Sequence, residues 1–137
     1  MLKCEYNDTL ITVYDNSNLL VQAFLSNING SLYITKVIGD ETSRYSKKSV
    51  ALYLLSCLVD QTQREVNFQV SDSDNFFQWV SWNRPWSISI FHFALIDTKL
   101  IYPWTRAANI VTVQASSALK DYHKITTLQT APELVVT

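Results

Sequence analysis

The chain has 137 residues, of which 47% are hydrophobic and 17% are charged, and its formal net charge is -1. A chain of this length is expected to form one domain and to bury a core without metal or disulfide support. The near-neutral charge excludes the basic footprint of a nucleic-acid-binding protein, and no apolar run reaches the roughly 18 residues of a membrane-spanning helix. The first residues lack the layout of a signal peptide, so we expect a cytoplasmic protein with no membrane partner.

The first 40 residues predict a three-stranded antiparallel meander. Residues 10–14 and 19–25 are rich in β-branched and large apolar side chains, and the Asp-Asn-Ser-Asn segment between them is turn material. Residues 31–38 alternate between apolar and polar side chains and predict the third strand.

Residues 46–63 predict the central helix of the domain. Residues 50–59 are almost all apolar and contain neither Gly nor Pro, and the run is too long for a typical strand. A helix that is apolar on nearly all sides is buried. Cys57 lies in this run and is interpreted as a buried thiol, which Cys4 can meet only if the N-terminus packs on the helix. The two cysteines, His92 and His123 show no metal-ligand spacing, so no metal site is predicted.

The chain after the helix predicts a mixture of strands and short helices. Residues 65–70 alternate, with Val66, Phe68 and Val70 on one face. Asp72 and Asp74 belong to a helix-start signal and are interpreted as cap residues of a short helix over residues 75–82.

The last third of the chain predicts two or three strands and a helix. Residues 86–96 predict a long strand. If Phe91 and Phe93 face the core, His92 faces the other way, where a surface or hydrogen-bonded structural histidine is favoured and a general base is the alternative. Residues 100–104 predict a returning strand, with Pro103 marking an edge or an end. Residues 110–113 extend or follow that strand, and residues 115–123 predict a final short helix.

The predicted element order is β-β-β-α-β-α-β-β. The strands at residues 31–38 and 65–70 flank the central helix, and such a crossover makes them parallel neighbours. We therefore predict the α+β class, with a mixed, mainly antiparallel sheet packed by one buried central helix. Residues 1–125 form the domain, and residues 126–137 form a C-terminal tail.

A basic cluster lies at the start of the central helix. Arg44, Lys47 and Lys48 stand where the helix dipole already carries partial positive charge, which favours a bound anion, and phosphate is the usual one. The alternative is that these side chains turn to solvent and are compensated by Asp40 and Glu41.

The element order over residues 31–104, together with residues 44–49, resembles the GCN5-related N-acetyltransferase (GNAT) superfamily. In that family a strand leads into an R/Q-x-x-G-x-G/A loop, which opens a helix and holds the pyrophosphate of coenzyme A. Arg44 matches the first motif position, whereas Lys47 and Ser49 replace the two small residues. Asn75 matches an Asn that follows the next strand in the family. Trp82 stands nearest to a Tyr that often serves as general acid, and the two N-terminal acceptor-site helices have no room before Leu10.

The resemblance implies a non-covalently bound coenzyme A or acyl-CoA, with acyl transfer as the reaction. Val37 and Ile38 then offer backbone groups to the ligand. Arg44, Lys47 and Lys48 contact phosphate, Ser49 donates at the helix start, and Asn75 completes the cofactor site. No catalytic residue is assigned. The decisive observation is whether the strands at 31–38 and 65–70 splay apart beside the helix start and leave a V-shaped cleft.

The alternative hypothesis is a non-catalytic, homo-oligomeric interaction module. Four tryptophans fall within a short segment and can serve as core anchors, as a ligand groove or as a contact surface. They are Trp79, Trp82, Trp86 and Trp104.

Overall fold

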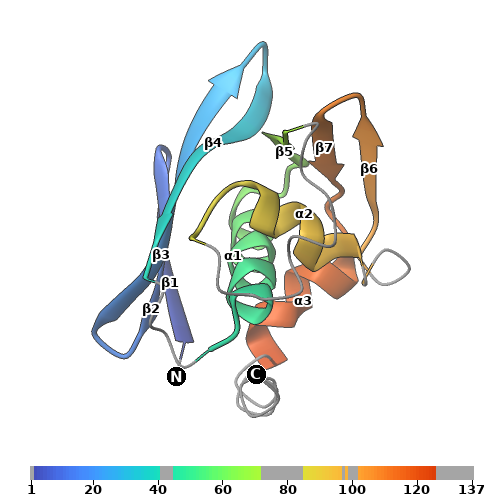
Figure 1. The fold of residues 1–137 in the computed structure, drawn as a ribbon. Coiled ribbons are helices and arrows are strands. Elements are labelled where there is room, and N and C mark those ends of the chain that lie inside the picture. The colour runs from blue at the N-terminus through green and yellow to red at the C-terminus, as the bar shows by residue number, and fades with distance from the viewer. Residues whose placement is uncertain (1, 41–44, 72–84, 97, 99–101, 126–137) are drawn as a thin grey trace.

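The computed structural model describes residues 2–40, 45–71, 85–96, 98 and 102–125 (Figure 1). In chain order the elements of these residues are β1 (Leu2–Asn7), β2 (Leu10–Asp15), β3 (Asn18–Ile28), β4 (Ser31–Gly39), α1 (Lys47–Thr62), β5 (Val66–Gln69), α2 (Ser89–Ile96), β6 (Trp104–Ala107), β7 (Ile110–Val113) and α3 (Ser117–Ile125).

The strands form one seven-stranded sheet in the order β1-β2-β3-β4-β5-β7-β6. β4 and β5 are parallel, and the other neighbouring pairs are antiparallel. The sheet is therefore mixed and mainly antiparallel, and the predicted α+β class and the parallel pair that flanks the central helix are confirmed.

The meander contains one strand more than the sequence predicted. β1 pairs with β2 along its whole length, from Leu2 opposite Asp15 to Asn7 opposite Leu10. The two strands are joined by a tight turn in which Oδ1 of Asn7 accepts from the backbone N–H of Thr9 at 3.0 Å. β2 thus follows β1 directly, and no helix lies between them.

The predicted central helix is confirmed almost to the residue. Ser46 is its N-cap, in an extended conformation, and the Ser46 hydroxyl accepts from the backbone N–H of Ser49 at 3.1 Å. Gln63 ends the helix in the left-handed region and bonds back to the carbonyl of Val59 at 2.8 Å. Every residue from Ser49 to Val59 is buried, as an all-apolar helix requires.

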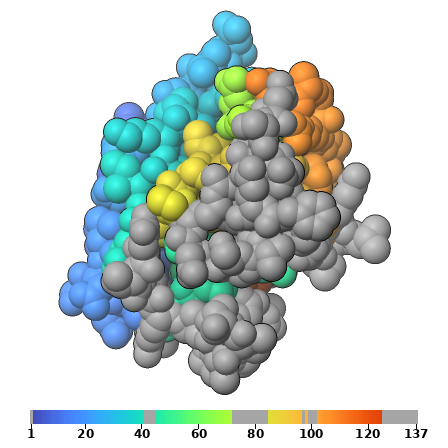
Figure 2. Space-filling model, in the orientation of Figure 1, coloured from blue at the N-terminus to red at the C-terminus, as the bar shows by residue number. Residues whose placement is uncertain are grey.

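The helices of the described residues pack together. α1 contacts both α2 and α3, and it also touches β1, β2 and β5 (Figure 1). In the space-filling view α2 lies between the β3–β4 side of the molecule and the β6–β7 side (Figure 2). Val66, Phe68 and Val70 are buried together, as their alternation predicted. Among the described residues no helix has the length and hydropathy needed to cross a bilayer.

The predicted long strand over residues 86–96 is wrong, because residues 89–96 form helix α2. Every residue from Ser89 to Leu95 is buried, so the segment has no polar face to reveal the helical period. Its apolar sequence pattern is therefore the same as that of a buried strand. His92 is accordingly a helix residue, packed edge-on against Trp104 with ring centroids 5.3 Å apart.

Of the strand predicted over residues 100–104, residues 100 and 101 lie outside the described residues, residues 102 and 103 are not strand, and only Trp104 is in a strand. β6 begins only at Trp104, after Pro103, and forms a hairpin with β7 through a turn in which Ala108 has a φ of 54°. β6 is the last strand of the sheet order, which agrees with the edge position expected from Pro103. The predicted strand at residues 110–113 and the predicted final helix are confirmed as β7 and α3. The helix predicted over residues 75–82, its cap residues Asp72 and Asp74, and the tail at 126–137 lie outside the described residues.

Candidate functional site

β4 and β5 separate soon after they meet. Their parallel pairing covers Leu32 with Val66, Tyr33 with Asn67 and Ile34 with Phe68. β4 then continues to Gly39 beside β3, while the backbone N–H of Val70 bonds to the carbonyl of Asn109 at 2.8 Å. The sheet thus divides into a β1–β4 half and a β5–β7 half beyond Ile34, where β4 and β5 diverge (Figure 1).

Two local features hold this divergence in place. A register shift in the β3–β4 ladder between Phe24 and Leu25 turns β4 with β3, since a bulge bends and twists its strand. Asn67 lies in the middle of the three paired β4–β5 positions, one residue before the pairing ends. Its Nδ2 donates to the carbonyl of Leu32 at 3.1 Å, and its Oδ1 accepts from the Thr112 hydroxyl at 2.7 Å. One buried amide therefore joins β4, β5 and β7 where the strands begin to part.

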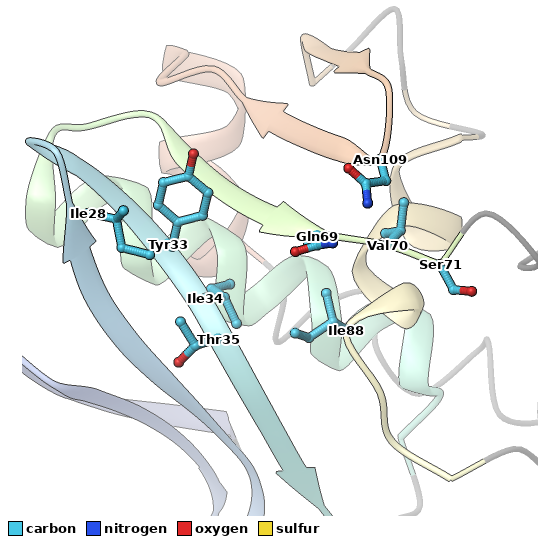
Figure 3. A pocket seen from close by; sticks show the side chains of 9 residues that line it. All are labelled: Ile28, Tyr33, Ile34, Thr35, Gln69, Val70, Ser71, Ile88 and Asn109. Carbon is cyan, nitrogen blue, oxygen red and sulfur yellow. The ribbon is translucent and has the colours of Figure 1, made fainter.

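A pocket of about 810 Å³ occupies the divergence (Figure 3). Ile34 and Val70 are buried, Ile88 precedes α2 and is half-buried, and together they supply apolar surface. Exposed Thr35, Gln69 and Ser71 open the pocket to solvent. The complete lining consists of Ile28, Tyr33, Ile34, Thr35, Gln69, Val70, Ser71, Ile88 and Asn109. A few polar groups around apolar surface are typical of small-molecule sites.

The predicted cofactor residues lie on both sides of the link between β4 and α1. Val37 is half-buried on β4, and Ile38 is 45% exposed. Lys47 and Lys48 are half-buried in the first turn of α1, which contains no acidic residue. Ser49 is 1% exposed, and its backbone N–H is bonded to the Ser46 hydroxyl, so it is part of the helix cap. Arg44 and Asn75 lie outside the described residues.

Trp86 packs on the end of β4. Its indole ring lies where a side chain at Gly39 would stand, and its Nε1 donates to the carbonyl of Asp40 at 3.2 Å. Trp104 is anchored in the same way, because its Nε1 donates to the carbonyl of Leu95 at 2.9 Å. These two tryptophans are therefore packing residues, and Trp86 covers the end of β4 at Gly39. Trp79 and Trp82 lie outside the described residues.

The fold also brings together Ser56, His123 and Asp60, which sequence spacing did not connect. The Ser56 hydroxyl lies 2.9 Å from Nδ1 of His123, and Nε2 of His123 lies 3.6 Å from a carboxylate oxygen of Asp60. Ser56 is fully buried, and its oxygen also accepts from the backbone N–H of His123 at 2.9 Å. A hydroxyl enclosed in this way joins α1 to α3 and has no access to a substrate.

None of the residues that line the pocket was among the site residues predicted from the sequence. The predicted site followed the helix start, whereas the pocket begins nearer the β3–β4 turn and draws residues from β5, the β6–β7 turn and the approach to α2. No local motif connects these segments, because strand divergence is a property of pairing partners. Comparisons of the chain with models of protein families, with curated proteins and with solved structures found no match.

Proposed function

We propose that the protein binds an acyl-CoA, or a related phosphate-bearing thioester, between β4 and the start of α1, in the manner of a reduced GNAT-like protein. The observation that carries the proposal is the divergence of β4 from β5 with an open pocket at its apex. Beyond Ile34 the edge of β4 that faced β5 runs on without a β5 partner. An extended ligand arm can lie along that edge and add its own hydrogen bonds to the sheet.

The pocket and the first turn of α1 lie at opposite ends of the proposed site, and the chemistry of each suits one part of such a ligand. Ile34, Val70 and Ile88 at the pocket favour an acyl group, because burying apolar surface is favourable. At the other end Lys47 and Lys48 stand in the first turn of a 16-residue helix, where the dipole and the cations both attract phosphate. β4 links the two ends, so one ligand can use both.

The missing glycines change how phosphate is held. In the family resemblance small residues allow the loop backbone to approach the pyrophosphate, and here Lys47 and Ser49 occupy those positions. We propose that the lysine side chains take over much of this contact, as point charges rather than as a backbone cradle. Acyl transfer is the reaction that the resemblance implies, and no side chain is assigned as its acid or base.

Calorimetric titration of the full chain with coenzyme A and acetyl-CoA tests the proposal. The variant Lys47→Glu/Lys48→Glu is expected to weaken binding of both ligands by at least about tenfold, since two attractive charges become repulsive. Lys3→Glu/Lys124→Glu makes the same change of net charge at exposed positions on β1 and α3 and serves as the matched control. If both variants lose affinity equally, the effect comes from net charge rather than from Lys47 and Lys48. If the wild type shows no binding at millimolar ligand, the proposal is wrong.

A second pair of variants locates the acyl end. Gln69→Trp places a large ring in the pocket and is expected to weaken acetyl-CoA binding, whereas Thr105→Trp places the same ring on exposed β6 and is expected to have no effect. If Gln69→Trp leaves the affinity unchanged, the acyl group does not enter this pocket.

A homo-oligomeric interaction module is the competing function, and one observation favours it. Ile38 on β4 is 45% exposed and Leu19 on β3 is 38% exposed, which is high for large apolar side chains on neighbouring strands. We propose a contact through this part of the sheet rather than through Trp86 and Trp104. Light scattering of the wild type and of Ile38→Glu tests it, and a wild-type monomer at tens of micromolar would exclude it.

A further inference from the structure

Two residues on β1 and two residues on α1 have nearly the same spacing along their elements. Leu2 and Cys4 are two residues apart on β1, which is roughly 6.6 Å along a strand. Tyr53 and Cys57 are four residues apart on α1, which is about 6 Å along a helix. The Tyr53 hydroxyl donates to the carbonyl of Leu2 at 3.0 Å in a buried contact. Because the two spacings agree, that contact sets Cys4 opposite Cys57.

Cys57 belongs to the buried core and Cys4 packs against that core, so the two thiols differ in access. Cys57 is 1% exposed, whereas Cys4 is only partly buried. The neighbouring Cys57 side chain lowers the pKa of Cys4, and burial raises the pKa of Cys57 well above its usual range. Cys4 is therefore the more acidic and more accessible sulfur, and Cys57 is its protonated buried neighbour. The proposed ligand site uses neither residue.

We propose that Cys4 and Cys57 are a modification site at which a peroxide closes a disulfide between β1 and α1. The Cys4 thiolate attacks one peroxide oxygen and becomes a sulfenic acid, while the O–O bond breaks and hydroxide leaves. The Cys57 sulfur then attacks the Cys4 sulfur, the S–O bond breaks, and water leaves with the Cys57 proton. Both thiols are oxidised, and one peroxide is reduced to two waters. A dithiol reductant reverses the reaction.

The disulfide would join the edge strand β1 to the central helix α1, whose residues from Ser49 to Val59 are buried. It would close a loop that contains β2, β3, β4 and most of α1, and a long closed loop restricts the unfolded chain strongly. The oxidised protein should therefore resist unfolding more than the reduced protein. This inference is independent of the proposed ligand.

Treatment of the reduced full chain with stoichiometric hydrogen peroxide tests the proposal. We expect both thiols to disappear from a denatured thiol titration, the intact mass to fall by two hydrogen atoms, and a non-reducing digest to contain linked Cys4 and Cys57 peptides. The melting temperature should rise by roughly 5 °C and return to its starting value after dithiothreitol treatment. Two remaining thiols, a disulfide between two chains, or a Cys4 carrying only sulfinic acid would each overturn the proposal.

Single-cysteine variants separate the two roles. Cys57→Ala should retain a Cys4 sulfenic acid that dimedone labels, whereas Cys4→Ser should leave Cys57 unmodified at the same peroxide dose. Neither variant should show a peroxide-dependent rise in melting temperature. Because Cys4 is partly exposed, Cys4→Ser is the milder change and keeps the test usable if Cys57→Ala folds poorly. Faster oxidation of Cys57 than of Cys4 would contradict the assigned order.

Discussion

The indole ring of Trp86 occupies the space in which any side chain at Gly39 would have to stand. A Cβ at Gly39 would overlap with Cδ1 and Cγ of the Trp86 ring. The φ of Gly39 is not in the left-handed region, so steric room rather than backbone freedom requires glycine here. The contact secures the approach to α2 against the end of β4, next to the proposed ligand site.

Gly39→Ala is expected to destabilise the protein by about 1–3 kcal/mol, because the indole ring must move out of a packed position. Urea unfolding measures the change. A double-mutant cycle with Trp86→Ala supplies the control, since the alanine at residue 39 should cost much less when the ring is already absent. Additive effects in the cycle would show that the contact is not the source of the loss.

Asn67→Ala is expected to lower the free energy of unfolding by roughly 1–3 kcal/mol, because the half-buried Thr112 hydroxyl and the buried Leu32 carbonyl each lose a partner. The amide joins both halves of the sheet next to the point where β4 and β5 diverge. The variant should therefore also lower the affinity for a ligand bound in the pocket there. Denaturant unfolding and acetyl-CoA titration are the two measurements. Thr105→Ala on the exposed edge strand should change neither, and an Asn67→Ala protein of unchanged stability would contradict the role given to this amide.

Ser56→Ala is expected to cost about 1–2 kcal/mol of stability, because the serine oxygen is bonded to both Nδ1 and the backbone N–H of His123. The loss should appear first at α3, whose docking on α1 depends on this contact. Hydrogen exchange of α3 amides compared with those of β2 measures it. Equal acceleration in both elements would mean that the serine stabilises the whole domain rather than this helix contact.

The stability of the protein should fall as the pH drops below about 6.5, the ordinary pKa of histidine. Burial lowers the pKa of His123 in the folded state, and nearby Lys124 acts in the same direction, while Asp60 and Asp121 oppose the shift. The unfolded chain therefore binds the proton more readily, so the stabilisation is present above the unfolded pKa and is lost as pH decreases.

Urea midpoints of the wild type and of His123→Gln, compared between about pH 7.5 and about pH 5, isolate this contribution from other titrating groups. Glutamine keeps a polar side chain beside Ser56 but cannot take up a proton in this range. The advantage of the wild type should shrink at the lower pH, and a constant difference would refute the assignment to His123.

Local sequence determined much of the fold because several elements carry their own signals. The central helix was predicted within one residue at each end, since residues 50–59 contain no helix breaker and Ser46 can cap the first turn. Strands β2, β3, β4 and β5 follow their β-branched and alternating patterns. α2 was mistaken for a strand because all sides of residues 89–95 are buried, and without a polar face the two periods cannot be distinguished.

Tertiary structure alone decided the features on which the proposed function depends. The basic start of α1 is visible in the sequence, but the position of the pocket depends on where β4 leaves β5, which no local pattern encodes. Ser56 and His123 are 67 residues apart, and Trp86 bonds to a carbonyl 46 residues away. Cys4 packs against the core that contains Cys57 only because β1 contacts α1. Side-chain periodicity reports which face of an element is buried, whereas the partner of that face is set by packing between segments distant in the chain.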